Sequence, residues 1–206
     1  LTCSPNLMGS LREKGLWDPA KGAFHFAQTF GGKMLEKPET AFFNSRRVWG
    51  AIRRFNPSMK FDPLSHEYPL FIKPEKEISL QSLMEALRDR FEDTEYDAFP
   101  RSGGTGKDRP ICVPSCVHSD VIQLREDLPA DIGAVLWGVI GTPHTSPYIP
   151  FHFGTQEIPE PYLKAGPVFD PTSAFWRFRA LSDLVLVDFR QLFPTVQSAW
   201  GELEDE

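Results

Sequence analysis

The chain has 206 residues, of which 41% are hydrophobic and 24% charged, and its formal net charge is -6 at pH 7. This length and composition suit one domain with a packed core, or a large part of one, and exclude a mainly disordered chain. The negative charge argues against a nucleic-acid backbone as the main partner, because phosphate binding needs clustered lysine and arginine. No apolar run approaches the roughly 20 residues of a membrane-spanning helix, so we expect no membrane partner.

Three cysteines, Cys3, Cys112 and Cys116, cannot all pair with one another. An odd number without a dense framework favours a reducing compartment, and we expect a cytoplasmic protein. The opening residues Leu1 to Pro5 resemble the end of a strand that runs directly into a helix. We therefore expect residues 1–206 to be the C-terminal portion of a single domain whose N-terminal half lies outside this chain.

The first half of the chain predicts helices. Ser4 and Pro5 offer an N-cap and a proline at the first helical position. Ser79 in the same way precedes a run of apolar residues at helical spacing. The expected helices cover residues 4–15, 24–30 (closed by Gly31 and Gly32), 38–55 and 79–91.

Two stretches of the first half read as loop. Residues 56–78 are rich in proline, and we expect a single strand there, within Tyr68 to Lys73. The glycine run from Gly103 to Lys107 lacks the spacing of a phosphate-binding loop, so we interpret it as a flexible connection.

Strands follow. Residues 111–124 are rich in β-formers, residues 132–140 form a nearly continuous apolar run, and residues 148–153 come after turn residues. The last two runs predict an antiparallel hairpin. The run from Ala134 to Trp137 does not alternate, which favours burial on both faces.

Helices return at Asp170 and again from Pro194 to Glu204, where the chain should fray into an acidic tail. Helices, then adjacent strands, then helices predict an α+β fold with the sheet covered by helices.

Cysteine and histidine residues suggest two further kinds of site. On a strand over residues 111–124, Cys112, Cys116 and His118 would share one face, but no second Cys/His pair has matching zinc spacing. Cys116, His118 and Asp120 imitate a catalytic triad, although real triads are assembled across a fold. We interpret both cysteines as buried or partly buried strand residues, and a zinc-binding module is the last alternative.

Two neighbouring arginines, Arg46 and Arg47, lie in one expected helix. They should point about 100° apart, so one can face inward while the other stays in water. An inward arginine can stabilise an anionic intermediate or hold a substrate carboxylate. The alternative is a surface helix with ordinary salt bridges. The acidic stretch from Asp89 to Asp97 is interpreted as a solvated helix end.

A series of short segments then runs through almost the whole chain. They are residues 4–7, 44–49, 73–75, 87–97, 109–112, 123–125, 128–133, 135–137, 158–162 and 170–176. In this order they are similar to the C-terminal half of the dipeptidase A family, the bacterial dipeptidases related to the secernins.

The resemblance implies the four-layer αββα fold of N-terminal nucleophile hydrolases. It also implies autocatalytic removal of a propeptide, which exposes an N-terminal cysteine. That thiolate attacks the peptide carbonyl to give an acyl-enzyme, and its own α-amino group, with a pKa near 7.7–8.0, serves as the base. No cofactor is needed. The nucleophile should lie upstream of Leu1, so we expect this chain alone to be inactive.

Two site residues follow from more distant relatives. Ser45-Arg46 resembles the Ser-Arg step of penicillin V acylases and bile salt hydrolases, which gives Arg46 the role of electrostatic support. Cys3 stands where those acylases have an asparagine that donates to the oxyanion. A thiol is a poor donor, so Asn6 or a backbone N–H is the expected replacement.

The predicted partners are a dipeptide substrate, the missing N-terminal half, and a second copy in a homo-oligomer. Two alternatives stay open. One is an amidase of the same superfamily that acts on non-peptide amides, and the other is a non-catalytic, secernin-like protein.

Overall fold

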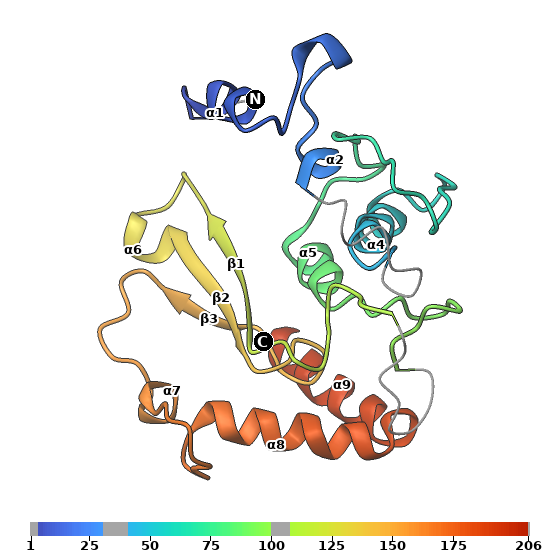
Figure 1. Ribbon diagram of the computed structural model, residues 1–206. Coiled ribbons are helices and arrows are strands. Elements are labelled where there is room, and N and C mark those ends of the chain that lie inside the picture. Colours follow the sequence, from blue (N-terminus) through green and yellow to red (C-terminus); the bar gives the residue numbers. More distant parts are fainter. Residues whose placement is uncertain (1–3, 31–40, 100–107, 206) are drawn as a thin grey trace. The chain divides into compact units, whose positions relative to one another are not determined.

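The computed structural model describes residues 4–30, 41–99 and 108–205, without the side chains of Ala27, Gln28 and Asp205. The chain divides into two compact units, Leu1–Phe42 and Phe43–Glu206. The mixture of helices and a small antiparallel sheet confirms the α+β class (Figure 1). The predicted closure of one helix by Gly31 and Gly32, and the loop from Gly103 to Lys107, lie outside the described residues.

The first unit contains short helices. Gly15 has φ 65°, and the backbone N–H of Leu16 returns to the Leu11 carbonyl at 2.9 Å, so the first helix ends near Gly15 as predicted. Its start differs, because the N-cap is Asn6 rather than Ser4. The helices are α1 (Leu7–Glu13), η1 (Pro19–Lys21) and α2 (Phe26–Phe30).

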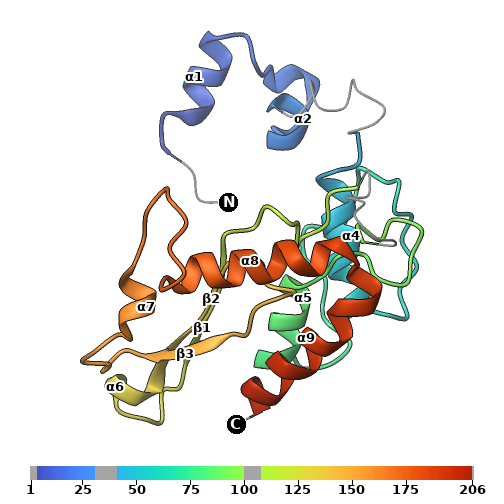
Figure 2. The same cartoon turned by 90° about the horizontal axis from the view of Figure 1, so that it is seen from below.

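The second unit holds the sheet and its covering helices. In Figure 2, α8 runs beside the strands and α9 turns away from its end. The elements are α4 (Ser45–Phe55), α5 (Leu80–Leu87), β1 (His118–Leu124), α6 (Ala130–Gly133), β2 (Ala134–Ile140), β3 (Ile149–His152), α7 (Glu160–Leu163), α8 (Ala174–Val187) and α9 (Phe189–Asp205).

The strands pair antiparallel in the order β1-β2-β3, so the predicted β2–β3 hairpin is confirmed. On one face Val121 and Val139 pack against Met84 of α5. On the other face Ile122 lies opposite Leu136, and these side chains are 67% and 38% exposed. The prediction of burial on both faces is therefore wrong for this part of the sheet, because α5 covers only one face.

Two predicted strand segments are loops. Tyr68–Lys73 runs as loop, and residues 111–117 form a turn in which Cys116 N–H donates to the Val113 carbonyl at 2.9 Å. Prolines explain both differences, since a proline cannot donate to a ladder. Cys112, Cys116 and His118 therefore do not share a strand face.

Several helix boundaries also differ from the prediction. The second unit's first helix begins at Ser45 rather than at residue 38, although residues 38–40 lie outside the described part. Helix α5 ends at Leu87, before Phe91. Helix α8 begins at Ala174, because the Asp170 carboxylate accepts from the Thr172 N–H at 2.8 Å and forms a turn instead.

The final helix α9 is tied to the sheet through a buried ion pair. Arg88, just after α5, donates through Nη1 to Glu204 Oε2 at 3.0 Å, and its guanidinium lies 3.7 Å from the Trp200 ring. Glu204 also accepts from the Tyr148 N–H at 2.6 Å, and its side chain is only 2% exposed. The expected frayed acidic tail is thus wrong at Glu204, which is a structural residue.

Removing Glu204 should unfold the protein more easily. Glu204→Ala leaves Arg88 buried without its counter-charge, so we expect the free energy of unfolding to fall by about 3 kcal/mol. Urea unfolding followed by circular dichroism measures the change. The control is Glu202→Ala, an exposed residue of the same helix, which should change it by about 0.5 kcal/mol or less. Equal effects of the two substitutions would contradict a structural role of the pair.

Candidate active site

Helix α4 carries arginines at both ends, Arg46 and Arg47 in its first turn and Arg53 and Arg54 in its last. Gly50 lies between them on the buried side. A Cβ at Gly50 would lie 2.7 Å from Asp89 Oδ2 and 2.8 Å from Phe91 Cε1. The helix can therefore approach the loop after α5 this closely only because the position is glycine.

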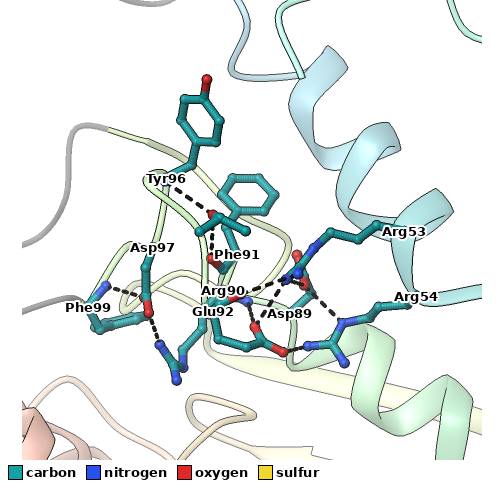
Figure 3. A network of polar contacts seen from close by, with 10 residues as sticks. Arg53, Arg54, Asp89, Arg90, Phe91, Glu92, Tyr96, Asp97 and Phe99 are labelled. Atoms are coloured by element: carbon teal, nitrogen blue, oxygen red, sulfur yellow. Dashed lines mark hydrogen bonds and ion pairs between the residues drawn. The ribbon is translucent and has the colours of Figure 1, made fainter. Parts of the chain in front are cut away.

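Asp89 holds the C-terminal end of α4. Its carboxylate is fully buried, and Oδ1 accepts from Arg53 Nη2 at 2.8 Å and from Arg54 Nε at 2.9 Å (Figure 3). Glu92 forms ion pairs with the same two arginines, at 3.5 Å from Arg53 Nη2. The acidic stretch from Asp89 to Asp97 is therefore not the solvated helix end that we predicted, because its first carboxylate is a buried partner of α4.

The loop after Asp89 has an unusual backbone. Phe91 and Asp93 adopt φ of 64° and 61°, a region that L-residues with large side chains rarely occupy. The Thr94 hydroxyl donates to the Phe91 carbonyl at 2.7 Å, and the Tyr96 N–H donates to the Thr94 hydroxyl at 3.2 Å. Phe91 is fully buried, and its burial and these bonds hold the conformation. Figure 3 shows Tyr96 at the far side of this loop from Asp89.

Arg46 is the inward arginine of the pair. It is 6% exposed, its guanidinium lies 3.9 Å from the centroid of the Tyr96 ring, and it forms an ion pair with Asp108. Burial lowers the pKa of Arg46, while the neighbouring Tyr96 and Tyr68 act in the opposite direction; a guanidinium nevertheless stays charged. The alternative of a surface helix with ordinary salt bridges is wrong for this residue.

Arg47 is half-buried rather than fully in water, and its Nε donates to the Arg109 carbonyl at 3.0 Å. The segment beginning at Asp108 thus binds both arginines of the first turn. Arg46 is presented as a fixed cation with an aromatic ring on one side and a carboxylate at its edge, which is an arrangement suited to an anionic group.

Asn6, the second predicted site residue, is the exposed N-cap residue of α1 in the first unit. Arg46 belongs to the second unit, so their meeting in one site stays a prediction. Cys3, in the position of the expected oxyanion donor, lies outside the described residues.

The structure adds a cysteine–histidine contact that the sequence did not reveal. Cys112 Sγ lies 3.2 Å from His144 Nδ1, and both side chains are buried. Burial raises the pKa of Cys112 well above its usual value and lowers the pKa of His144 to about 3. Both groups are therefore neutral near pH 7. A nucleophilic pair needs a thiolate, so this contact is structural.

The imitation of a triad at Cys116, His118 and Asp120 is not a site. His118 Nε2 lies 4.0 Å from Asp120 Oδ1, and both side chains are more than half exposed. Among the described residues, no three histidine, cysteine or acidic side chains are grouped so that they could hold a metal ion. Nor does any described helix have the length and apolar character to cross a membrane.

Comparison with known proteins identifies the class as peptidase. The model of "Peptidase family C69" matches residues 1–202, and the chain belongs to this family, which confirms the resemblance to the dipeptidases.

Relatives in this family have names that agree with it. The chain is 32% identical to a "Probable dipeptidase" of Salmonella dublin over 166 residues, which are 80% of this chain and 37% of that protein. It is 25% identical to "Dipeptidase A" of Lactobacillus helveticus over 191 residues, 91% of this chain and 38% of that protein. The chain thus spans little more than a third of the length of these relatives.

The close fit at Gly50 gives a prediction. Gly50→Ala places a methyl group against a buried carboxylate and a buried ring, so the free energy of unfolding should fall by about 1–3 kcal/mol. Gly201→Ala is the matched control, since a Cβ there meets nothing within 4 Å. Within helix α9 it should stabilise the protein by about 0.5–1 kcal/mol. Thermal and urea unfolding of both variants measure the difference, and a stabilising Gly50→Ala would contradict the packing.

Proposed function

We propose that the chain is part of a dipeptidase that hydrolyses short peptides through an N-terminal cysteine and an acyl-enzyme intermediate. Membership of a peptidase family and the names of its relatives support this activity. The observation that carries the proposal is the buried, preoriented guanidinium of Arg46 in the first turn of α4.

In the proposed reaction the α-amino group of a cysteine upstream of Leu1 takes the proton of its own thiol, and the resulting thiolate attacks the peptide carbonyl. The carbonyl oxygen becomes anionic in the tetrahedral intermediate. Arg46 stabilises this charge, or holds the free carboxylate of the dipeptide, through its guanidinium. Because the side chain is already held by Asp108 and the Tyr96 ring, little conformational freedom is lost on binding.

Asn6 is the proposed donor to the oxyanion. A side-chain amide can donate two hydrogen bonds, and Asn6 follows the position at which the related acylases carry their donor asparagine. Neither described cysteine suits the role of nucleophile as well as an N-terminal one does. Cys112 is a buried, neutral thiol, and Cys116 lies within a turn of the chain and has no α-amino group of its own to serve as base.

The four-layer αββα arrangement is the proposed fold of the complete protein. Its support is the partly exposed face of the sheet, where Ile122, Leu124 and Leu136 are 67%, 76% and 38% exposed. A second sheet packed about 10 Å away would bury these side chains.

Arg46→Ala in the complete enzyme tests the proposal. We expect kcat/KM for dipeptides to fall by about 100-fold or more, the usual cost of losing one preorganised donor to a developing anion. The control is Arg179→Ala, a partly exposed arginine paired with Asp183 on α8, which should retain full activity. Circular dichroism shows whether each variant is folded. Unchanged kinetics of a folded Arg46→Ala would remove this residue from the site.

Comparing substrates separates the two roles of Arg46. If it holds the substrate carboxylate, the variant should lose more activity on a dipeptide than on the corresponding dipeptide amide. If it stabilises the tetrahedral intermediate, both substrates should lose activity equally. Hydrolysis of acyl amides but not dipeptides by the native enzyme would instead make the protein an amidase.

A further inference from the structure

The two cysteines of the second unit lie on one short turn. Cys116 N–H donates to the Val113 carbonyl at 2.9 Å, and Cys116 Sγ lies 3.9 Å from the Ile111 carbonyl oxygen. The Cys116 sulfur is therefore folded back over the turn toward the residue next to Cys112. The two thiols lie close enough for each to shift the pKa of the other. Cys112 is fully buried, whereas Cys116 is half-buried.

The surroundings of the turn favour the thiolate form of Cys116 and the neutral thiol form of Cys112. Interaction with the Cys112 thiol is the largest cause that lowers the pKa of Cys116 to about 6. Burial acts in the opposite direction, and the Val113 backbone and the neighbouring Arg47 lower it further. Burial raises the pKa of Cys112. At neutral pH the accessible sulfur is thus the ionised, reactive one, and the buried sulfur is a neutral thiol directly beside it.

We propose that Cys112 and Cys116 form a redox-active pair, a modification site at which a hydroperoxide oxidises Cys116 and Cys112 then closes an intramolecular disulfide across the turn. The unbonded state of both cysteines in the structure is the reduced form of this pair.

The chemistry is a two-electron oxidation. The Cys116 thiolate attacks an oxygen of hydrogen peroxide and the O–O bond breaks. The Cys116 sulfur becomes a sulfenic acid, and the departing hydroxide takes a proton from solvent to give one water. Cys112 then attacks this sulfur, the S–O bond breaks, and the thiol proton leaves with the hydroxide as a second water. His144 Nδ1, 3.2 Å from Cys112 Sγ, keeps the thiol oriented in the reduced state and loses this contact when the disulfide forms.

The pair lies on the segment that holds the arginines of the candidate active site. Asp108 forms the ion pair with Arg46, and the Arg109 carbonyl accepts from Arg47. Closing the disulfide draws Cys116 toward Cys112, and Cys112 lies only three residues after Arg109. This second part of the inference rests on the proposed function: closing the disulfide should weaken the hold on Arg46 and lower dipeptidase activity.

The sequence makes the disulfide easy to detect. Trypsin cannot cut between Lys107 and Arg125 except at Arg109, which precedes a proline, so both cysteines fall in one peptide and Cys3 in another. After hydrogen peroxide treatment of the full chain, peptide 108–125 should lose two hydrogen atoms and regain them with dithiothreitol. In the untreated protein near pH 7, iodoacetamide should modify Cys116 about 10-fold or more faster than Cys112.

Two variants complete the experiment. Cys116→Ser should prevent the mass loss, and Cys112→Ser should leave a Cys116 sulfenic acid that dimedone traps. If the peptide keeps both thiols, or if Cys116 becomes a sulfinic acid while Cys112 stays a thiol, the redox pair is wrong, whatever the enzyme hydrolyses. Because these readouts use no substrate, they stand even if the protein is not a dipeptidase.

Activity then tests the coupling separately. Cys116→Ser should keep the native activity before treatment and lose less of it in peroxide than the native enzyme does. If peroxide lowers the activity of both proteins equally while the disulfide forms in the native one, the redox pair exists but does not act on Arg46.

Discussion

Two neighbouring buried residues of opposite charge, Arg88 and Asp89, connect most of the second unit. Arg88 donates to Glu204 of α9 and to the carbonyls of Pro143 and Ser146 in the β2–β3 connection. The Asp89 carboxylate accepts hydrogen bonds from Arg53 and Arg54 at the end of α4. Its backbone carbonyl accepts from the Cys112 N–H at 2.8 Å. The end of α5 therefore joins the sheet, the last helix, α4 and the cysteine turn. Since removing ions from water is costly, such a junction is stable only when every partner is present.

This junction fixes the register of α4, and the register places Arg46. Arg53 and Arg54 can reach Asp89 only if Gly50 faces the same loop, where any larger residue would collide. Arg46 lies one turn before Gly50 on the same side of the helix, about 6 Å along its axis. The buried cation of the candidate site is thus a consequence of contacts at the opposite end of the helix. The loop between Asp89 and Tyr96 also supplies the ring on which Arg46 lies.

Local signals in the sequence predicted local structure well. Ser79 caps α5 through its hydroxyl, which accepts from the Ser82 N–H at 3.1 Å, and turn residues marked the hairpin correctly. The strand expected at Tyr68–Lys73 fails because Pro69 cannot donate to a ladder and because the described strands β1, β2 and β3 pair only with one another. The residues alone left open whether Arg46 faces inward, and the family resemblance supplied the choice.

The remaining contacts have no local signature. Asp89 and Arg54 are 35 residues apart, and Cys112 and His144 are 32 apart. Periodicity reports which face of an element is apolar but not which charge will be buried against which. In the sequence, a run of acidic residues after a helix has the same pattern whether its carboxylates are solvated or paired with arginines from another helix. Only the packed structure distinguishes the two cases.

The ion pair between Arg46 and Asp108 bears on what the site can recognise. With its charge already balanced, Arg46 gains less from a second carboxylate than an unpaired arginine would, because Asp108 repels that carboxylate at short range. A carbonyl oxygen is neutral in the bound peptide and becomes negative only as the thiolate adds to it. Repulsion from Asp108 is then small during binding, and the attraction of the guanidinium grows with the reaction. An interaction that strengthens toward the transition state is the kind that accelerates chemistry. Within the proposed reaction, the pairing with Asp108 therefore favours the anionic intermediate, rather than the substrate carboxylate, as the group that Arg46 would stabilise.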